Sequence, residues 1–304
     1  MTKKIERSPT DGAIAVTGAA GFVGGVVLRM LAASGIPVHG IARTPLAAAT
    51  GVTAHGWDPL RDAGPPAPGI QVDAVIDCAA ALPSRVDDPA ELKRINALLV
   101  EGAIDLAARR RGRLVYMSSQ SVYGRPGGAR IDTDTPLAPV APYGEAKRDA
   151  EAAIARAVAQ GRLVGAAVLR LPAVVGPGAH DNFPAAAAAT LIRAKTVTVF
   201  NPDAPYNAVV DAADLARFAI RLACVAAGFV AVSPATGPAT TIRDGVQAIA
   251  TGLGRTADLR VVPAPYTAPV LDPGPAIALG LAARPAWDVL FRYGESLSDT
   301  IHKE

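Results

Sequence analysis

Cysteine, histidine and aromatic residues are scarce in this chain. Its 304 residues include two cysteines, four histidines and 5% aromatic side chains. Cys78 and Cys224 cannot build a disulfide framework, and we expect Cys78 to be a buried thiol because it lies in an apolar run. The histidines stand apart from one another and from the cysteines, so no zinc-ligand spacing is present and we expect no metal site. They are His39, His55, His180 and His302.

Long apolar runs and a strong charge of either sign are also missing. No uninterrupted apolar segment reaches membrane-spanning length. Lys3, Lys4 and Arg7 precede an apolar stretch as in a signal peptide, but Asp11 and several glycines interrupt it, which favours strand, loop and helix. The formal net charge of +3 is too small to indicate nucleic acid. We expect a cytoplasmic protein that binds a small molecule, with no nucleic acid and no membrane as partner.

The only dense group of basic residues ends a helical pattern. Arg109, Arg110, Arg111 and Arg113 follow an apolar helix and precede a strand pattern. Cations are favourable near the carboxyl end of a helix. We interpret this run as a solvated helix cap rather than a binding patch.

Strand and helix patterns alternate through the first two thirds of the chain. Segments rich in Ala, Leu, Arg and Glu predict helices, and short apolar runs predict strands. Alternation of this kind indicates βαβ units, with a parallel sheet covered by helices on both faces. The segment 64–69, Gly-Pro-Pro-Ala-Pro-Gly, predicts a surface loop. The predicted helices are 22–34, 91–109 and 143–159, and the predicted strands are 13–17, 37–42, 73–78, 113–118, 166–171 and 228–232.

A glycine motif joins the first predicted strand to the first predicted helix. It reads Thr17-Gly18-Ala19-Ala20-Gly21-Phe22-Val23-Gly24. In such a motif Gly18 would allow a tight turn, Gly21 the close approach of phosphates, and Gly24 the packing of helix on strand. The N–H groups and positive dipole end of the helix attract a pyrophosphate. Glycines also mark ordinary turns, and that alternative stays open for the motif alone.

A second motif lies far downstream, at Pro142-Tyr143-Gly144-Glu145-Ala146-Lys147. It opens a predicted helix and places Tyr143 and Lys147 on one helical face. By itself this pair is usually surface decoration. Its occurrence after the glycine motif favours a common function.

The periodic pattern loosens after Pro177, where prolines and an alanine run indicate a smaller lobe whose loops close over a ligand. The predicted fold class is α/β, a doubly wound parallel sheet of the Rossmann type with a smaller C-terminal substrate lobe. We place the dinucleotide-binding domain at 1–176 and the substrate lobe at 177–304. Roughly 207–234 is expected to return to the first domain.

These residues resemble the extended short-chain dehydrogenase/reductases, also called the NAD-dependent epimerase/dehydratase family, over nearly the whole chain. The motifs together are specific for the family and not for one reaction. Besides the two motifs above, they are Ala79-Ala80, Asn96, Val115-Tyr116-Met117-Ser118-Ser119, Val122-Tyr123-Gly124, Leu169-Arg170, Val175-Gly176-Pro177-Gly178, Asp214-Leu215-Ala216, Leu279-Gly280 and Pro285.

The resemblance implies hydride transfer assisted by three catalytic residues, Ser119, Tyr143 and Lys147. Moving a hydride to or from a carbinol carbon requires a proton to move on the oxygen, which a tyrosine can handle if its pKa suits. Lys147 is expected to favour the phenolate of Tyr143 and to hold the nicotinamide ribose. Ser119 is expected to orient the substrate oxygen. Ser118 and Ser121 are competing hydroxyls.

The end of the second predicted strand bears on the choice of cofactor. An acidic residue there would bind the ribose 2′-OH of NAD, whereas an arginine can pair with the 2′-phosphate of NADP. This chain has Arg43 and no carboxylate there, so NADP is expected, with NAD possible and a solvated Arg43 as the alternative. Asp58 matches the family residue that meets the adenine, or else caps the following turn. The full set of expected cofactor contacts is Gly18, Gly21, Phe22, Val23, Gly24, Arg43, Asp58, Ala79, Ala80, Ala81, Asn96, Tyr143, Lys147 and Pro172.

Departures from the family pattern narrow the reaction. Gln120 and Ser121 stand where dehydratases carry an Asp-Glu pair, so sugar dehydration is not expected. Ala173 and the pair Tyr206-Asn207 replace residues that hold nucleotide sugars in epimerases. Arg193, Arg260, Arg284 and Arg292 could take over that role or be plain surface cations. The expected substrate contacts are Ser84, Ser119, Gln120, Tyr143, Asn182 and Asn207, of which Asn182 belongs to the segment 180–183 that could instead cap a helix.

Three functions remain open from the sequence. The first is an NADP-dependent oxidoreductase that reduces a carbonyl, or oxidises the matching alcohol, on a polar substrate such as a sugar or nucleotide sugar. The second is a sugar epimerase that retains NAD, and the third is a non-catalytic NADP-binding regulatory protein. The resemblance also implies a homodimer formed through the helices of Asn96 and Tyr143, where Ala150, Ala152 and Ala153 would permit close approach.

Overall fold

The computed structural model describes residues 12–62 and 64–301. The chain divides into two compact units, each made from three stretches of sequence. Unit 1 contains the residues up to Gly124, then Leu137–Arg170 and Ala216–Val232. Unit 2 contains Arg125–Pro136, Leu171–Leu215 and the residues from Ser233 onward. Residues 125–136 therefore belong to unit 2, although they lie inside the range expected for the dinucleotide-binding domain.

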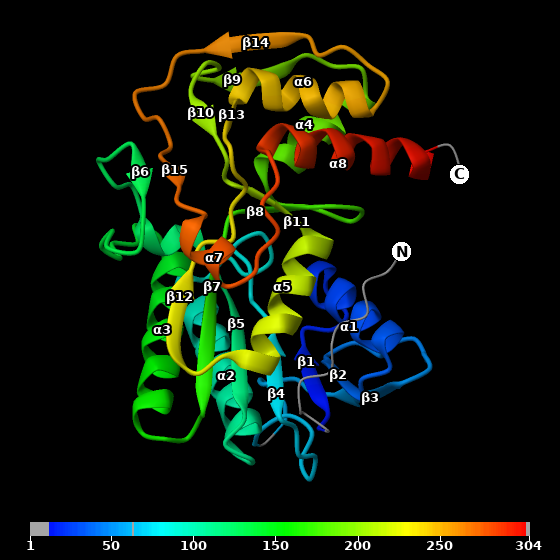
Figure 1. Cartoon of the computed structure of the whole chain (residues 1–304), viewed down its shortest axis with the longest axis vertical. Coiled ribbons are helices and arrows are strands. Elements are labelled where there is room, and N and C mark those ends of the chain that lie inside the picture. The colour runs from blue at the N-terminus through cyan, green and yellow to red at the C-terminus, as the bar shows by residue number, and fades with distance from the viewer. Residues whose placement is uncertain (1–11, 63, 302–304) are drawn as a thin grey trace. The chain divides into compact units, whose positions relative to one another are not determined.

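Unit 1 is built on a parallel sheet of seven strands in the order β12-β7-β5-β4-β1-β2-β3, which confirms the predicted Rossmann-type fold (Figure 1). All six predicted strands are present. The strand bounds are β1 Ile14–Thr17, β2 Val38–Ala42, β3 Val52–Gly56, β4 Ala74–Asp77, β5 Arg113–Ser119, β7 Gly165–Leu171 and β12 Gly228–Val232.

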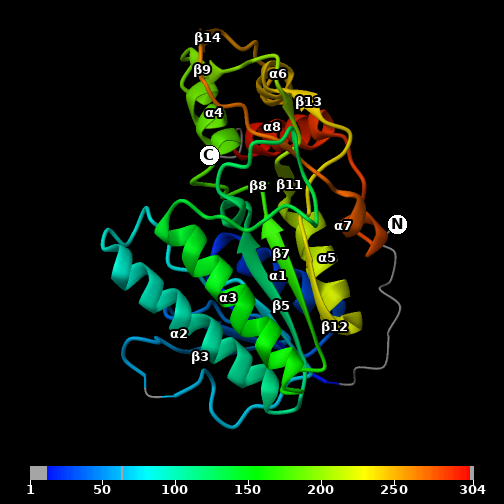
Figure 2. The ribbon, with the colours of Figure 1, turned by 90° about the vertical axis from the view of Figure 1, so that its left-hand side faces the viewer.

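Helices cover both faces of this sheet, with α2 and α3 side by side on one face and α1 and most of α5 on the other (Figure 2). Buried aliphatic side chains of β1, β4, β5 and β7 pack against α2 and α3 and form the core. The helix bounds are α1 Phe22–Ser34, α2 Pro89–Ala108, α3 Pro142–Ala159 and α5 Ala212–Val225, and a short 3₁₀ helix η1 spans Gln120–Tyr123.

The edge strand β3 was not predicted, and it corrects the expectation that the histidines are isolated. His39 on β2 and His55 on β3 lie with Nδ1 and Nε2 2.9 Å apart. The parallel register pairs His55 with Ile41, two residues after His39, so the two imidazoles share one face of the sheet. Burial lowers the pKa of both rings, which favours a neutral pair. His302 lies outside the described residues.

The proline-rich loop and the arginine run also differ from expectation, because Arg109 of the run is hydrogen-bonded to the loop. Pro66 and Ala67 are buried rather than exposed. The Arg109 guanidinium donates to the carbonyl oxygens of Ala67 at 2.7 Å, of Ile70 at 3.1 Å and of Pro66 at 3.1 Å. Arg113 donates to the Ala226 carbonyl at 3.0 Å. The arginines therefore fasten neighbouring segments, and the interpretation as a solvated cap is wrong for these two.

Unit 2 is built from short strand pairs and three longer helices. Its core lies between α4, α6 and α8. A side chain at Gly252 would lie 2.1 Å from the Phe291 carbonyl oxygen, and one at Gly294 2.3 Å from that of Ile249, so α6 and α8 touch backbone to backbone. The helices are α4 Phe183–Ile192, α6 Ile242–Gly252, α7 Gly274–Ala278 and α8 Ala286–Ile301, and the pairs are β6 (Arg130–Ile131) with β15 (Val270–Leu271), β8 (Ala173–Val175) with β11 (Val209–Asp211), β9 (Val197–Phe200) with β14 (Leu259–Val262), and β10 (Pro205–Tyr206) with β13 (Thr240–Thr241).

Within the described ranges, none of the helices combines the length and apolar character needed to cross a membrane. The same residues contain no group of three or more His, Cys, Asp or Glu side chains placed to hold a metal ion.

Candidate active site

The glycine motif forms a tight turn between β1 and α1 in unit 1. Gly18 has a φ of +63°, and a Cβ there would lie 2.7 Å from the backbone of Cys78 and Ala79 at the end of β4. A Cβ at Gly24 would lie 2.2 Å from the Gly18 carbonyl oxygen. These two positions therefore exclude any side chain. A Cβ at Gly21 would meet only the Gly18 oxygen, at 3.1 Å, so Gly21 is the opening of the turn.

Helix α1 begins at this opening without a capping side chain. Gly21 is its N-cap, no side chain of the described chain bonds to the cap position, and the first turn carries no acidic residue. A helix amino terminus of this kind combines N–H groups with the positive end of the dipole, which suits a phosphate. The cradle therefore fits the pyrophosphate of a dinucleotide.

The loop after β4 is fixed from two sides. Asn96 on α2 accepts a hydrogen bond from the Ala81 N–H at 3.2 Å and donates to the Ala81 carbonyl at 3.1 Å. Asp77, at the end of β4, accepts from the Ala79 N–H at 3.1 Å and from the Thr17 hydroxyl. Its Oδ2 atom is buried and has no hydrogen-bond partner among the described residues, and burial raises the pKa of this carboxyl. Asn96 thus orders the loop that contains Ala79, Ala80 and Ala81.

The three candidate hydroxyls at the end of β5 have different surroundings. Ser118 is 2% exposed and donates to Glu151 at 2.5 Å. Ser119 is half-buried and caps η1, where its Oγ accepts from the Ser121 N–H at 3.2 Å and from the Ser121 hydroxyl at 2.9 Å. Ser118 is therefore engaged in the interior, whereas Ser119 keeps its own hydrogen available as a donor.

Helix α3 brings Tyr143 and Lys147 next to this segment. A Cβ at Gly144 would lie 2.6 Å from the Ser121 carbonyl oxygen, so the first turn of α3 rests directly on η1. Lys147 is 1% exposed and its Nζ donates to the Met117 carbonyl at 2.7 Å. The same Nζ lies 4.5 Å from the centre of the Tyr116 ring and 5.7 Å from that of Tyr143. Ser119, Tyr143 and Lys147 thus come from elements that touch within unit 1.

Burial dominates the ionisation of this group. Desolvation raises the pKa of Tyr143 to about 12. It lowers the pKa of Lys147 to about 8, against the opposing influence of Asp77, Cys78 and Glu151. Burial therefore sets the direction of the Tyr143 pKa shift in the protein itself, and the expectation that Lys147 favours the phenolate of Tyr143 stays a prediction. At neutral pH Tyr143 is a neutral phenol, which can donate a proton.

Two expected cofactor contacts lie after β2 and β3. Arg43 is exposed and, among the described residues, makes no side-chain hydrogen bond or ion pair. Asp58 accepts from the Leu60 N–H at 3.0 Å, and its own N–H donates to Asp62 at 2.6 Å. Asp58 therefore does cap the following turn, and its other oxygen lies 3.7 Å from Arg61 Nε. An adenine contact by Asp58 stays a prediction.

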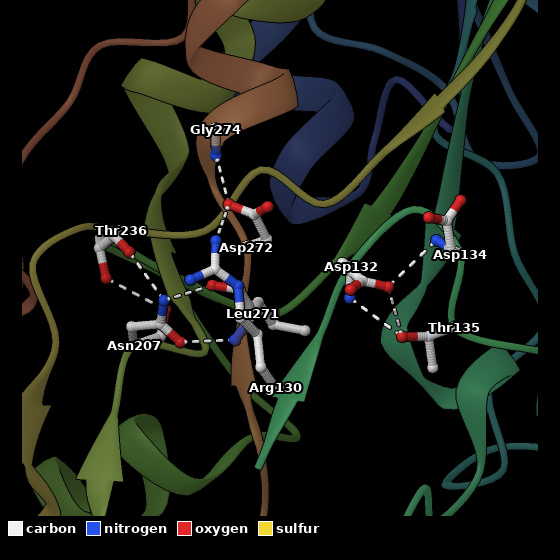
Figure 3. A network of polar contacts seen from close by, with 9 residues as sticks. All are labelled: Arg130, Asp132, Asp134, Thr135, Asn207, Thr236, Leu271, Asp272 and Gly274. Atoms are coloured by element: carbon white, nitrogen blue, oxygen red, sulfur yellow. Dashed lines mark hydrogen bonds and ion pairs between the residues drawn. The ribbon is translucent and has the colours of Figure 1, made fainter. Parts of the chain in front are cut away.

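The candidates of unit 2 hold backbone segments. Asn182 caps α4, accepting from the Ala185 N–H at 2.9 Å and donating to the Val174 carbonyl at 3.1 Å. The Asn207 amide donates to the carbonyls of Thr236 at 3.0 Å and Leu271 at 2.7 Å and accepts from the Leu271 N–H at 2.9 Å (Figure 3). Both amides are engaged in the fold, and their contact with substrate stays a prediction.

The other expected contacts are dispersed. Ser84 is exposed and Gln120 half-buried in unit 1, and Pro172 is buried in unit 2. Four arginines of unit 2 were candidates for substrate contact: Arg284 pairs with Asp214 at 3.1 Å and Arg292 with Asp288 at 3.1 Å, while Arg193 and Arg260 are exposed. The paired arginines already have a carboxylate partner.

Sequence reasoning missed a buried polar group behind the candidate site. Glu151 is 3% and Arg170 8% exposed, and Tyr123 is buried with them. A charged residue one turn after Lys147 on an otherwise apolar face was the available signal, since side chains four residues apart on a helix are neighbours. Asp77 was signalled in the same way, by a carboxylate inside an apolar strand.

The family comparison and the curated relatives agree. A sequence model described as the NAD dependent epimerase/dehydratase family matches residues 14–227. The dTDP-6-deoxy-L-talose 4-dehydrogenase (NAD(P)(+)) of Kitasatospora kifunensis is 31% identical over 271 residues, which is 83% of this chain and 82% of that protein. The UDP-glucose 4-epimerase of Azospirillum brasilense is 32% identical over 165 residues, 48% of this chain and 44% of that protein.

Solved structures share the fold at lower identity. MoeE5 in complex with UDP-glucose and NAD has a TM-score of 0.77 at 24% identity, covering 95% of this chain and 100% of the other. This likeness establishes the same arrangement of elements.

Proposed function

Because the chain belongs to the NAD dependent epimerase/dehydratase family, we propose that it moves a hydride between NADP and the 4-position of a nucleoside diphosphate 6-deoxysugar. It is an NAD(P)-dependent enzyme of the extended short-chain dehydrogenase/reductase type, a dehydrogenase or reductase or an epimerase. Its homologues are enzymes, which does not support the non-catalytic alternative. The position on the sugar and the kind of sugar are taken from the 31% identical relative.

The observation that carries the proposal is the neutral, proton-bearing Tyr143 beside the buried Lys147. A carbonyl that becomes an alcohol needs a proton on its oxygen, and a phenol with a pKa of about 12 keeps that proton until the oxygen takes up negative charge. Ser119 donates a second hydrogen bond to the same oxygen and orients it. The bound nicotinamide supplies the hydride in this direction and accepts it in the reverse direction.

Two features argue against dehydration, one of the other family reactions. Gln120 and Ser121 occupy the positions where a dehydratase needs an acid and a base, and neither side chain can transfer a proton at neutral pH. The Ser121 hydroxyl is moreover directed to Ser119. The protein is therefore proposed not to eliminate water from the sugar.

Arg43 supports NADP over NAD. It follows β2, is exposed, and has no side-chain partner in the described part of the chain. A guanidinium of this kind can pair with the 2′-phosphate that distinguishes NADP. Asp58 is assigned to the adenine amino group, and the α1 amino terminus to the pyrophosphate.

The test is an assay of dTDP-6-deoxy-L-talose oxidation with NADP and with NAD in parallel. The absorbance of the reduced nicotinamide measures the rate. Turnover with NADP in excess of NAD supports the proposal. Interconversion of UDP-glucose and UDP-galactose, with NAD retained through purification, would instead establish the epimerase. Inactivity of both assays with intact cofactor binding would remove the 6-deoxysugar as substrate.

We also propose a cytoplasmic homodimer formed through α2 and α3. Ala150 lies in the core of unit 1, so only Ala152 and part of Ala153 could face a partner. Sedimentation of the parent beside Ala152→Glu tests this contact, and an unchanged dimer in the variant would move the interface elsewhere.

A further inference from the structure

A buried ionic network lies directly behind Ser119, Tyr143 and Lys147. The Arg170 guanidinium on β7 donates to Glu151 on α3, with Nη2 to Oε2 at 2.9 Å and Nε to Oε2 at 3.2 Å. Ser118 on β5 donates to the other carboxylate oxygen at 2.5 Å. Arg170 Nη1 donates to the Tyr123 hydroxyl of η1 at 3.0 Å. One carboxylate and one guanidinium thus join four elements of unit 1.

These elements are the ones that carry the candidate catalytic residues. Ser118 precedes Ser119 on β5, and Tyr123 ends the 3₁₀ helix that Ser119 caps. Glu151 follows Lys147 by one turn of α3, on the same face of the helix. A shift of Glu151 would therefore move Ser119 relative to Tyr143 and Lys147.

Packing alone does not explain a charged pair at this place. Moving a carboxylate and a guanidinium out of water costs free energy that their mutual attraction often does not recover. Apolar residues of the same volume often stabilise a fold at least as well. A fixed charge next to the buried lysine has a separate effect, because every nearby charge shifts the pKa of Lys147. The groups around Lys147 are Asp77 and Cys78 at the end of β4, Tyr116 on β5, and Tyr143 and Glu151 on its own helix.

We propose that Glu151 is a positioning residue of the active site, which, together with Arg170, clamps Ser118 and Tyr123 so that Ser119 is held in register with Tyr143 and Lys147. This inference rests on the proposed function for its effect on turnover. Its electrostatic part does not, because Glu151 also favours the charged form of Lys147 by raising its pKa against desolvation. Both parts can be measured separately.

The first measurement is the titration of Lys147 without cofactor or substrate. The chain has six lysines, so a protein with isotope-labelled lysine gives few NMR signals, and Lys147→Met identifies the one that matters. In Glu151→Gln, which removes the carboxylate charge, the Lys147 signal should titrate at lower pH than in the parent. In Arg109→Gln, which breaks a half-buried arginine contact elsewhere in unit 1, it should titrate as in the parent.

The second measurement is turnover by Ser118→Ala, which leaves both charges in place and removes only the hydrogen bond from β5 to Glu151. We expect kcat to fall by roughly 10- to 100-fold with KM nearly unchanged, because the reacting groups lose their alignment. Lys147 should titrate as in the parent in this variant. Tyr123→Phe should give a smaller loss, since it removes one hydrogen bond of Arg170.

Two outcomes would overturn the inference. If Lys147 titrates at the parent pH in Glu151→Gln, Glu151 has no electrostatic role. If Ser118→Ala and Tyr123→Phe turn over like the parent while the melting temperature falls, the network is structural only. An enzyme inactive on every sugar nucleotide would contradict the proposed function and leave the lysine titration as the deciding result.

Discussion

Unit 1 and unit 2 each bury polar side chains, but those side chains do different things. In unit 1 the buried polar residues include three charged ones beside the candidate catalytic segments, Lys147, Glu151 and Arg170, at 1%, 3% and 8% exposure. In unit 2 the most engaged one is a neutral amide, Asn207, whose three hydrogen bonds all go to backbone. The charged residues of unit 1 lie beside the candidate catalytic residues, whereas Asn207 fastens short strands. Neither kind of group is confined to one unit, because Asn96 in unit 1 is a buried amide and Asp214 in unit 2 is a buried carboxylate paired with Arg284.

The architecture explains why unit 2 needs such amides. Its strands are two to four residues long and occur in pairs, so a strand such as β15 gains little from its ladder. Asn207 and the Arg130–Asp272 ion pair, at 2.8 Å, supply the contacts that a longer sheet would provide through its own backbone (Figure 3). The seven parallel strands of unit 1 share a continuous backbone ladder, to which side-chain bonds such as that from Thr17 on β1 to Asp77 on β4 are added.

The largest expected effect separates chemistry from folding. Tyr143→Phe keeps the ring and deletes the hydroxyl, so turnover should fall by roughly 10²–10⁴-fold while cofactor binding and melting temperature stay near the parent values. Tyr266→Phe, on an exposed loop of unit 2, is the matched control. Steady-state kinetics with a cofactor titration measure both, and parent-like turnover of Tyr143→Phe would exclude this residue as the acid.

The second prediction concerns the pH dependence of stability. The pKa of Lys147 falls from 10.5 in the unfolded chain to about 8 in the folded one, so below pH 8 both states carry the proton. Between pH 8 and 10.5 only the unfolded state binds it, so the contribution of Lys147 to stability rises with pH, by about 3 kcal/mol in total. Denaturant unfolding of the parent and Lys147→Met, compared from pH 7 to 10, isolates this contribution. A pH-independent difference between the two proteins would show that Lys147 is not buried as a charge.

The third prediction compares the two buried asparagines directly. Asn207→Ala and Asn96→Ala each leave backbone groups without a hydrogen-bond partner. Each buried unpaired group should lower the free energy of unfolding by about 1–3 kcal/mol. Hydrogen exchange should increase in β15 and around Thr236 for Asn207→Ala, and in the loop after β4 for Asn96→Ala, with the other unit unaffected in each case. Equal exchange changes in both units would contradict two separate cores.

The fourth prediction tests the cofactor choice. If Arg43 pairs with the 2′-phosphate, Arg43→Ala should weaken NADP binding by about 1.5–3 kcal/mol and leave NAD binding nearly unchanged. Because Arg43 is exposed, the melting temperature should not change. Calorimetric titration with both dinucleotides measures the difference, and equal losses would show that the arginine only orders its loop.

The smallest effect is expected at the surface of unit 2. The pKa of Asp272 is lowered by its hydrogen bond from Arg130 and by the Gly274 N–H. A lowered carboxyl pKa gives stability that is complete above 3.8 and lost as the pH falls through the folded value. Arg130 is 60% exposed, so Arg130→Met should cost less than about 1 kcal/mol at neutral pH, and nothing in strong acid. A loss of several kcal/mol in the free energy of unfolding would contradict this prediction, because the ion pair would then stabilise unit 2 as much as Asn207 does.

The sequence predicts the long parallel sheet well because its strands are buried on both faces and read as continuous apolar runs. β3 escapes this reasoning, since an edge strand with exposed Thr53 and Ala54 has no such run. The strand pairs of unit 2 are shorter than any period that could reveal them. The His39–His55 contact depends on strand register, which sequence spacing alone does not contain.

The candidate site is predictable to a similar, limited degree. Ser119, Tyr143 and Lys147 follow from motif order and family resemblance, and their elements do meet in unit 1. The raised pKa of Tyr143 does not follow from the sequence. The spacing shows that Tyr143 and Lys147 are neighbours but not how deeply they are buried, and burial determines the direction of both pKa shifts. Arg109 shows the same limit, since only the folded chain brings the carbonyls of 66–70 to it.

The way the chain alternates between the units has a consequence for its synthesis. The sheet of unit 1 lacks its outer strand β12 until residue 232 has been made, because Ala216–Val232 is the last of its three stretches. Unit 2 contributes β6 near residue 130, but its partner β15 appears only at residue 270. Unit 1 therefore cannot finish folding until residue 232 has been made, and unit 2 cannot until β15 has been made. The growing chain keeps β6 without its native partner β15 for most of the time that the ribosome takes to translate the second half of the chain.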